Sequence, residues 1–203
     1  MNRYPANPKL GVRRTKTNGK RLAVLANLIR FTVAAANATV ASTTGILAAF
    51  ATSTAATVKT TGFTQPSVAR NVTLTAGGTA GDIKAVQGIV EGTNDNDEVI
   101  TETLPAFTVD TAGSVTGTKA FKTFTKVTIP AMDGEGATVS VGFGEKLGLP
   151  FKLAHNTVLF AFLDNTKEGT APTVTVSATA LESNTVDLET ALSSKVVDVY
   201  LLA

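Results

Sequence analysis

Residues 83–104 read IKAVQGIVEGTNDNDEVITETL, and this stretch decides the fold class. Two segments rich in β-branched residues, 83–91 and 98–104, flank a polar connection at 92–97 that is made of Gly, Thr, Asn and Asp. Asn and Asp favour tight turns because they tolerate left-handed backbone angles and bond to their own backbone. The stretch therefore predicts a β-hairpin.

Similar strand-like segments recur on both sides of this hairpin. They are residues 71–75, 120–129, 138–143, 157–163, 173–178 and 195–202. Together with the two segments of the hairpin, they give about eight expected strands. Gly, Pro, Asn and Asp separate them, and no regular alternation of strands with helices is visible. The sequence predicts a mainly β protein whose residues 71–203 form an antiparallel β-sandwich or jelly-roll-like domain. Within 120–129 we expect Phe121 to share one face with Val127 and Ile129, and Phe124 to lie on the other.

Residues 31–70 form an Ala- and Thr-rich segment with few large side chains. Such a segment has little apolar bulk for a core of its own, so we expect it to pack against other chains. This predicts a homo-oligomer, with a trimer favoured. Residues 21–33 fit either a short helix or a strand, and the spacing of Leu22, Leu25 and Ile29 favours the helix.

Charge divides the chain into two parts. Residues 1–81 carry ten basic residues and no acidic one, whereas 82–203 carry all sixteen acids and eight Lys, so the net charge of +2 hides halves of +10 and −8. We expect residues 1–30 to form an extended basic arm that meets an anionic surface. That surface could be nucleic acid, an acidic protein or the acidic half of a neighbouring copy, and a solvated tail is the alternative. The expected partner-binding residues are Lys9, Arg13, Arg14, Lys16, Lys20, Arg21 and Arg30.

Several function classes are disfavoured by residue content. The chain has no Cys and one His, which excludes disulfides, thiol chemistry and zinc–cysteine sites. Nucleic acid is disfavoured because the first twenty residues hold one aromatic side chain, Tyr4, and no recognition motif is present. A membrane span within the uncharged segment 31–58 is disfavoured by its weak apolarity. We expect no metal, no cofactor and no catalytic residue, and so no enzyme.

Two possible sites have simpler interpretations. Residues 94–98 read NDNDE and offer oxygen ligands for calcium, but Asn and Asp also dominate hairpin tips. His155 could belong to a catalytic triad whose other members lie elsewhere in the sequence. A hairpin turn and an ordinary loop or strand-edge histidine are the interpretations that we favour.

Three stretches resemble small virion structural proteins of tailed bacteriophages. They are 99–104 (VITETL), 115–127 (VTGTKAFKTFTKV) and 136–150 (GATVSVGFGEKLGLP), within the middle third of the chain. The resemblance implies a structural role in the virion, and a capsid decoration protein that binds the major capsid protein at the capsid surface is the favoured form. A tail, neck or baseplate protein is the alternative, and a surface adhesin-like module is more remote. The resemblance implies no catalytic residues.

Overall fold

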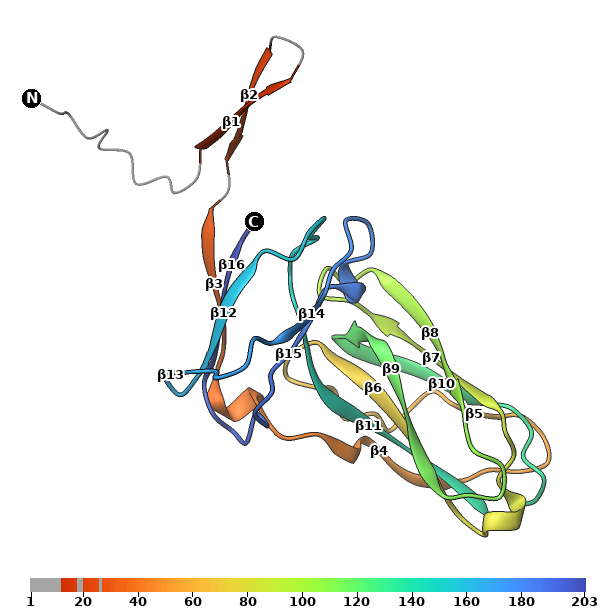
Figure 1. Cartoon of the computed structure of the whole chain (residues 1–203). Helices are drawn as coiled ribbons and strands as arrows, with labels where there is room; N and C mark the ends of the chain where they lie inside the picture. Colours follow the sequence, from red (N-terminus) through yellow and green to blue (C-terminus); the bar gives the residue numbers. More distant parts are fainter. Residues whose placement is uncertain (1–11, 18–19, 26) are drawn as a thin grey trace, which may run out of the picture.

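The computed structural model describes residues 12–17, 20–25 and 27–203, and the side chains of 27–203. Strands make up 51% of the model and helices 5%, so the predicted mainly β fold with antiparallel sheets is confirmed (Figure 1). The described helices are three short 3-10 turns: η1 (Ala35–Asn37), η2 (Ala80–Asp82) and η3 (Leu181–Ser183).

Two sheets face each other to form a β-sandwich. The first sheet has four strands in the order β5 (Thr57–Lys59), β10 (Thr123–Ile129), β7 (Gln87–Thr93) and β8 (Val99–Ala106). The second has the order β14 (Thr173–Thr175), β15 (Thr185–Asp187), β11 (Ala137–Gly148), β6 (Arg70–Gly78) and β9 (Gly113–Phe121). β4 (Ser42–Ala51) pairs with β11 along the part of that strand that precedes its contact with β15.

Alternate residues of these strands fill the space between the two sheets. This first core contains Leu74 on β6, Val90 on β7, Leu104 on β8 and Val139 on β11, all fully buried. Phe121 and Phe124 stack within it, with ring centroids 5.2 Å apart. Apolar burial of this kind is the main force that holds two sheets together.

A third sheet covers a second core. Its order is β13 (Thr166–Lys167), β12 (Val158–Leu163), β16 (Val197–Leu202) and β3 (Leu28–Val33). Val199 and Leu201 point from this sheet into a cluster that also contains Leu147 of β11 and Val186 of β15. β11 therefore contributes to both cores, and it ties the third sheet to the sandwich.

Strands that precede residue 71 pair with strands that follow it. β3 pairs with β16, β4 with β11 and β5 with β10, so most of segment 31–70 is built into the sheets of its own chain. Backbone pairing within the chain compensates for the small side chains of these strands, and Ile46 supplies a fully buried anchor. Packing of the segment against other chains stays a prediction. The oligomer itself stays a prediction.

Two local predictions are wrong. Residues 21–33 contain strand rather than helix, with β2 (Lys20–Leu25) and β3, since cross-strand partners override a helical spacing. In 120–129, a bulge between Phe124 and Lys126 inserts one residue against β7. The bulge reverses the alternation, so Phe124, Val127 and Ile129 are all buried on the same side.

The predicted hairpin turn at 92–97 is confirmed. β7 pairs with β8 across it, and the Asn94 side-chain oxygen accepts hydrogen bonds from the backbone N–H of Asn96 and of Glu98. Asp97 has a φ of 61°, in the left-handed region that Asn and Asp tolerate. The residues that suggested calcium thus build the turn through their own hydrogen bonds.

Candidate docking surface and an arginine cavity

The basic residues of the expected arm lie largely on a two-stranded hairpin. Arg13, Arg14 and Lys16 are on β1 (Val12–Thr17), and Lys20 and Arg21 are on β2; Lys9 lies outside the described residues. Lys16 is paired across the hairpin with Arg21. β1 and β2 form a sheet of their own, and Figure 1 draws them as a separate ribbon.

Arg30 differs from the other predicted residues because it belongs to the body of the protein. It lies on β3, opposite Tyr200 of β16, and its guanidinium forms a two-pronged ion pair with Asp198. Nε lies 2.8 Å from Oδ1 and Nη2 lies 2.6 Å from Oδ2, while the Thr32 hydroxyl donates to Oδ1 at 2.6 Å. Arg30 is therefore not part of an extended arm, because an acidic partner within the chain already holds it.

This ion pair affects both of its members. The hydrogen bond from Arg30 lowers the pKa of the Asp198 carboxyl below its usual value, against the opposing effect of burial. The same hydrogen bond raises the pKa of Arg30. The Asp198 side chain is 4% exposed and that of Arg30 is 52% exposed, so the pair anchors β3 from the outside of the sheet.

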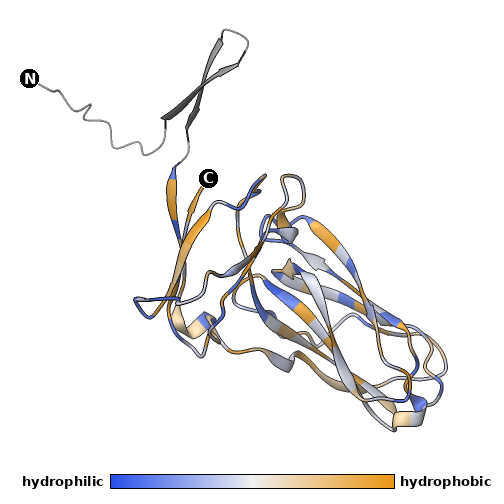
Figure 2. Ribbon diagram, viewed as in Figure 1, coloured by the Kyte–Doolittle hydropathy of each residue, from blue (hydrophilic) through white to orange (hydrophobic). Residues whose placement is uncertain are grey.

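Aromatic side chains gather on the face of the third sheet that points away from the second core. Phe160, Phe162 and Tyr200 form a cluster with ring centroids 5.1 to 5.7 Å apart. Leu159 and Leu28 are about half exposed beside them, and Figure 2 shows hydrophobic colour along β12, β16 and β3. This surface was not predicted from the sequence. The two Phe residues at period 2 in 157–163 were the available signal.

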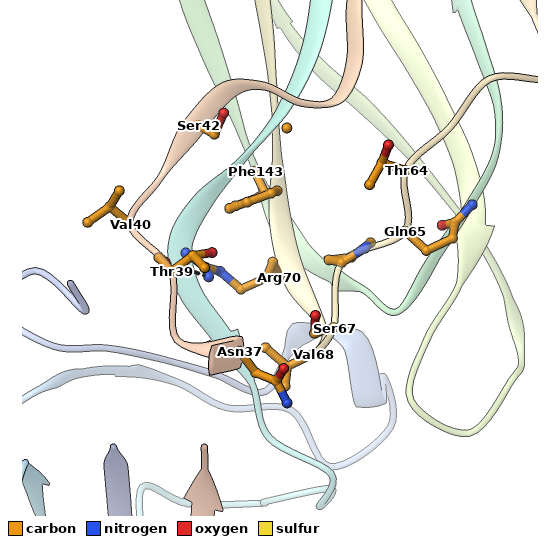
Figure 3. A pocket seen from close by; sticks show the side chains of 12 residues that line it. Asn37, Thr39, Val40, Ser42, Thr64, Gln65, Ser67, Val68, Arg70 and Phe143 are labelled. Carbon is orange, nitrogen blue, oxygen red and sulfur yellow. Dashed lines mark hydrogen bonds between the residues drawn. The ribbon is translucent and has the colours of Figure 1, made fainter. Parts of the chain in front are cut away.

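A cavity of about 390 Å³ lies between the connection from β3 to β4 and the segment before β6 (Figure 3). Its lining includes Thr39, Ser67, Val68, Arg70 and Phe143. Arg70 is 1% exposed, so its guanidinium lies at the floor of the cavity rather than at its rim. Nothing in the sequence separated Arg70 from the other basic residues, because only the fold brings residues 39 and 144 to its side chain.

The remaining candidates are His155 and groups of side chains that could bind a metal ion. His155 is an exposed residue in a bend before β12. Within 27–203, no group of three or more His, Cys, Asp or Glu side chains is placed to hold a metal ion. The helices of the described part of the chain are too short to cross a membrane.

No protein-family model, curated protein or solved structure matches this chain.

Proposed function

We propose that this chain is a non-enzymatic structural component of a tailed-phage virion, and that it decorates the capsid by binding the major capsid protein. The observation that carries the proposal is the basic hairpin β1–β2, which precedes an edge strand of a body that holds all sixteen acidic residues. An element with this charge suits attachment to an acidic protein surface. The virion resemblance of residues 99–104, 115–127 and 136–150 supports the same role.

Attachment would combine weak contacts. Exposed ion pairs contribute at most about 1 kcal/mol each, so several basic residues must act together with backbone pairing. A hairpin can supply such pairing by adding its free edge to a sheet of the partner. A capsid repeats its binding site many times, so an oligomer with several hairpins would gain from multivalent attachment. We expect a trimer for this reason.

The experiment is a binding assay with purified particles that lack the protein. Arg13→Gln with Arg14→Gln should reduce retention on the particles at least several-fold at low salt, because neutral side chains remove the ionic contacts. The matched control is Lys152→Gln with Lys195→Gln, which removes two positive charges from the body instead. Equal retention of both double variants and the unmodified chain would contradict the role of the hairpin.

A tail, neck or baseplate protein is the second candidate, because the resemblance covers those proteins as well. Copy number separates the two. If the chain is a decoration protein, quantitative mass spectrometry of purified virions should give a copy number comparable to that of the major capsid protein. A ratio of a few copies per virion would favour the tail or neck, and absence from purified virions would exclude both and favour a surface module.

A further inference from the structure

Arg70 carries a buried positive charge that no carboxylate of the described residues contacts directly. Its Nε and Nη2 donate to the carbonyl oxygen of Gly144, and Nη1 donates to that of Thr39 at 2.9 Å. The Phe143 ring centroid lies 4.8 Å from Cζ. None of the ion pairs within 4.0 Å in 27–203 includes Arg70. Its neighbours are thus neutral dipoles and an aromatic face, which is unusual for a charge removed from water.

The charge is retained despite this burial. Removal from water lowers the pKa of Arg70 to about 10, and the nearby carboxylates of Glu145 and Asp187 oppose that effect from beyond contact distance. A group with that pKa stays protonated at neutral pH. Arg70 is therefore a charged group whose counter-charge is incomplete, and this is the condition under which a bound anion gains most.

Several hydrogen-bond donors at the Arg70 cavity have no acceptor among the described residues. A guanidinium has five N–H bonds, and the three hydrogen bonds to carbonyl oxygens leave two without an acceptor in the described residues. Thr39 and Ser67 line the same cavity, and both are labelled with Arg70 in Figure 3. Their hydroxyl groups make no hydrogen bond to other described side chains or backbone. Donors therefore surround one open volume.

The sequence explains why this volume lacks negative charge. Apart from Phe143, every lining residue falls within 37–70, and residues 1–81 contain no Asp or Glu. The basic half of the chain thus forms the cavity, while an aromatic ring from the acidic half closes one side. Gly45 allows this closure, because a Cβ there would lie 2.5 Å from a Phe143 ring carbon.

We propose that the Arg70 cavity binds a carboxylate, either of a small organic acid or of an Asp or Glu side chain of a partner. A volume of about 390 Å³ is at the small end of ligand pockets, and it suits a small monocarboxylic acid or a single acidic side chain. One guanidinium matches one negative charge. Glu145 accepts a hydrogen bond from the Ala41 N–H beside the cavity, so a phosphate dianion would meet about twice the repulsion that a singly charged carboxylate meets there. This inference concerns the isolated chain and does not rest on the virion role.

The test uses two singly charged carboxylate probes, butyrate and N-acetyl-aspartyl amide, with inorganic phosphate as the competing oxyanion. At about 50 mM, a carboxylate probe should raise the melting temperature by about 3 °C over sodium chloride of equal ionic strength. It should also shift the ¹⁵N–¹H resonance of Arg70 Nε, which is identified by its loss in Arg70→Lys. A larger effect of the aspartyl probe would indicate a protein side chain as the occupant, and a larger effect of butyrate would indicate a free acid.

Ser67→Leu keeps the assay valid if Arg70→Lys does not fold. Ser67 is an exposed lining residue, so a leucine there should fill the cavity without removing the guanidinium, and it should abolish both effects. Thr54→Leu places the same side chain at an exposed position outside the cavity and should leave both effects unchanged. Effects that survive Ser67→Leu would overturn the proposal. So would a response to phosphate alone, or no response to either carboxylate.

Discussion

Arg30 on β3 and Asp198 on β16 are diagonal neighbours across the two strands, and two hydrogen bonds of 2.8 and 2.6 Å join their side chains. The pair lies at the start of the first body strand that follows the basic hairpin. The ion pair therefore strengthens the pairing of β3 with β16, and the contact of Arg30 with a partner stays a prediction.

Arg30→Gln should lower the melting temperature at pH 7, because it leaves a nearly buried carboxylate without its partner. The pKa of Asp198 is lowered in the folded chain, so the stabilisation by the pair is complete above the ordinary carboxyl pKa of about 3.9. It is lost as the pH falls through the lower folded value. Thermal unfolding from pH 7 to pH 2 should thus show a difference from the unmodified chain that shrinks below about pH 4.

The control for this prediction is Lys84→Gln. Lys84 pairs with Asp133 at 3.1 Å, but both side chains are about half exposed, so this substitution should change stability little. A difference for Arg30→Gln that stays constant down to pH 2 would show that the ion pair is not its cause.

Leu74→Ala and Leu201→Ala should each cost about 2–5 kcal/mol, because each removes a fully buried side chain. Leu74 lies in the first core and Leu201 in the second. Since β11 contributes to both cores, we expect one cooperative transition in calorimetry that moves down in either variant. Val99→Ala, at a position that is 80% exposed, should stay within about 0.5 kcal/mol of the unmodified chain. A second, separate transition in Leu201→Ala would contradict the coupling of the cores.

Asn184→Ala should destabilise the second core by about 3 kcal/mol, since unsatisfied buried groups are costly. The Asn184 side chain is fully buried, and its oxygen accepts hydrogen bonds from the N–H groups of Leu153 and Ser177. Its amide nitrogen donates to three carbonyl oxygens between residues 177 and 181. Asn156→Ala is the matched control, because exposed Asn156 accepts one hydrogen bond, from Val158, and should lose less than about 1 kcal/mol. Equal losses in urea unfolding would contradict this role of Asn184.

Gly142→Ala should disrupt the pairing of β4 with β11. A Cβ at position 142 would lie 1.8 Å from the Ser42 carbonyl oxygen, and a backbone atom cannot move aside as a flexible side chain can. We expect a loss of about 1–3 kcal/mol, with faster amide hydrogen exchange in β4. Gly113→Ala is the control, since its added Cβ would meet no atom within 4 Å. Unchanged exchange in β4 would contradict the close approach.

The fold class was predictable because strand periodicity and turn residues are local signals. The hairpin at 92–104 is the clearest case, since Asn94 forms the turn within its own sequence neighbourhood. The bulge at Phe124 was not predictable, because the extra residue is defined only against β7. β4 was missed for a related reason. Its small side chains give little periodic pattern, and its place is set by pairing with β11 about 90 residues later.

The candidate sites show the same limit. Charge counting identified the basic N-terminal segment, which became the hairpin, because charge is a property of composition. It could not separate Arg30 from Arg70. Asp198 pairs with the first, whereas the carbonyl groups of Thr39 and Gly144 contact the second. Those partners come from distant parts of the sequence, so only the folded chain distinguishes an anchored arginine from one that lacks a carboxylate partner.

The most direct measurement of the central claim is a cryo-EM reconstruction of purified virions. The account predicts density on the outer capsid surface that fits the β-sandwich and third sheet, with the segment before β3 in contact with acidic residues of the major capsid protein. Density for the same fold only in the tail or neck would contradict the decoration role while keeping the chain in the virion. Virions that contain no such density would contradict the claim itself.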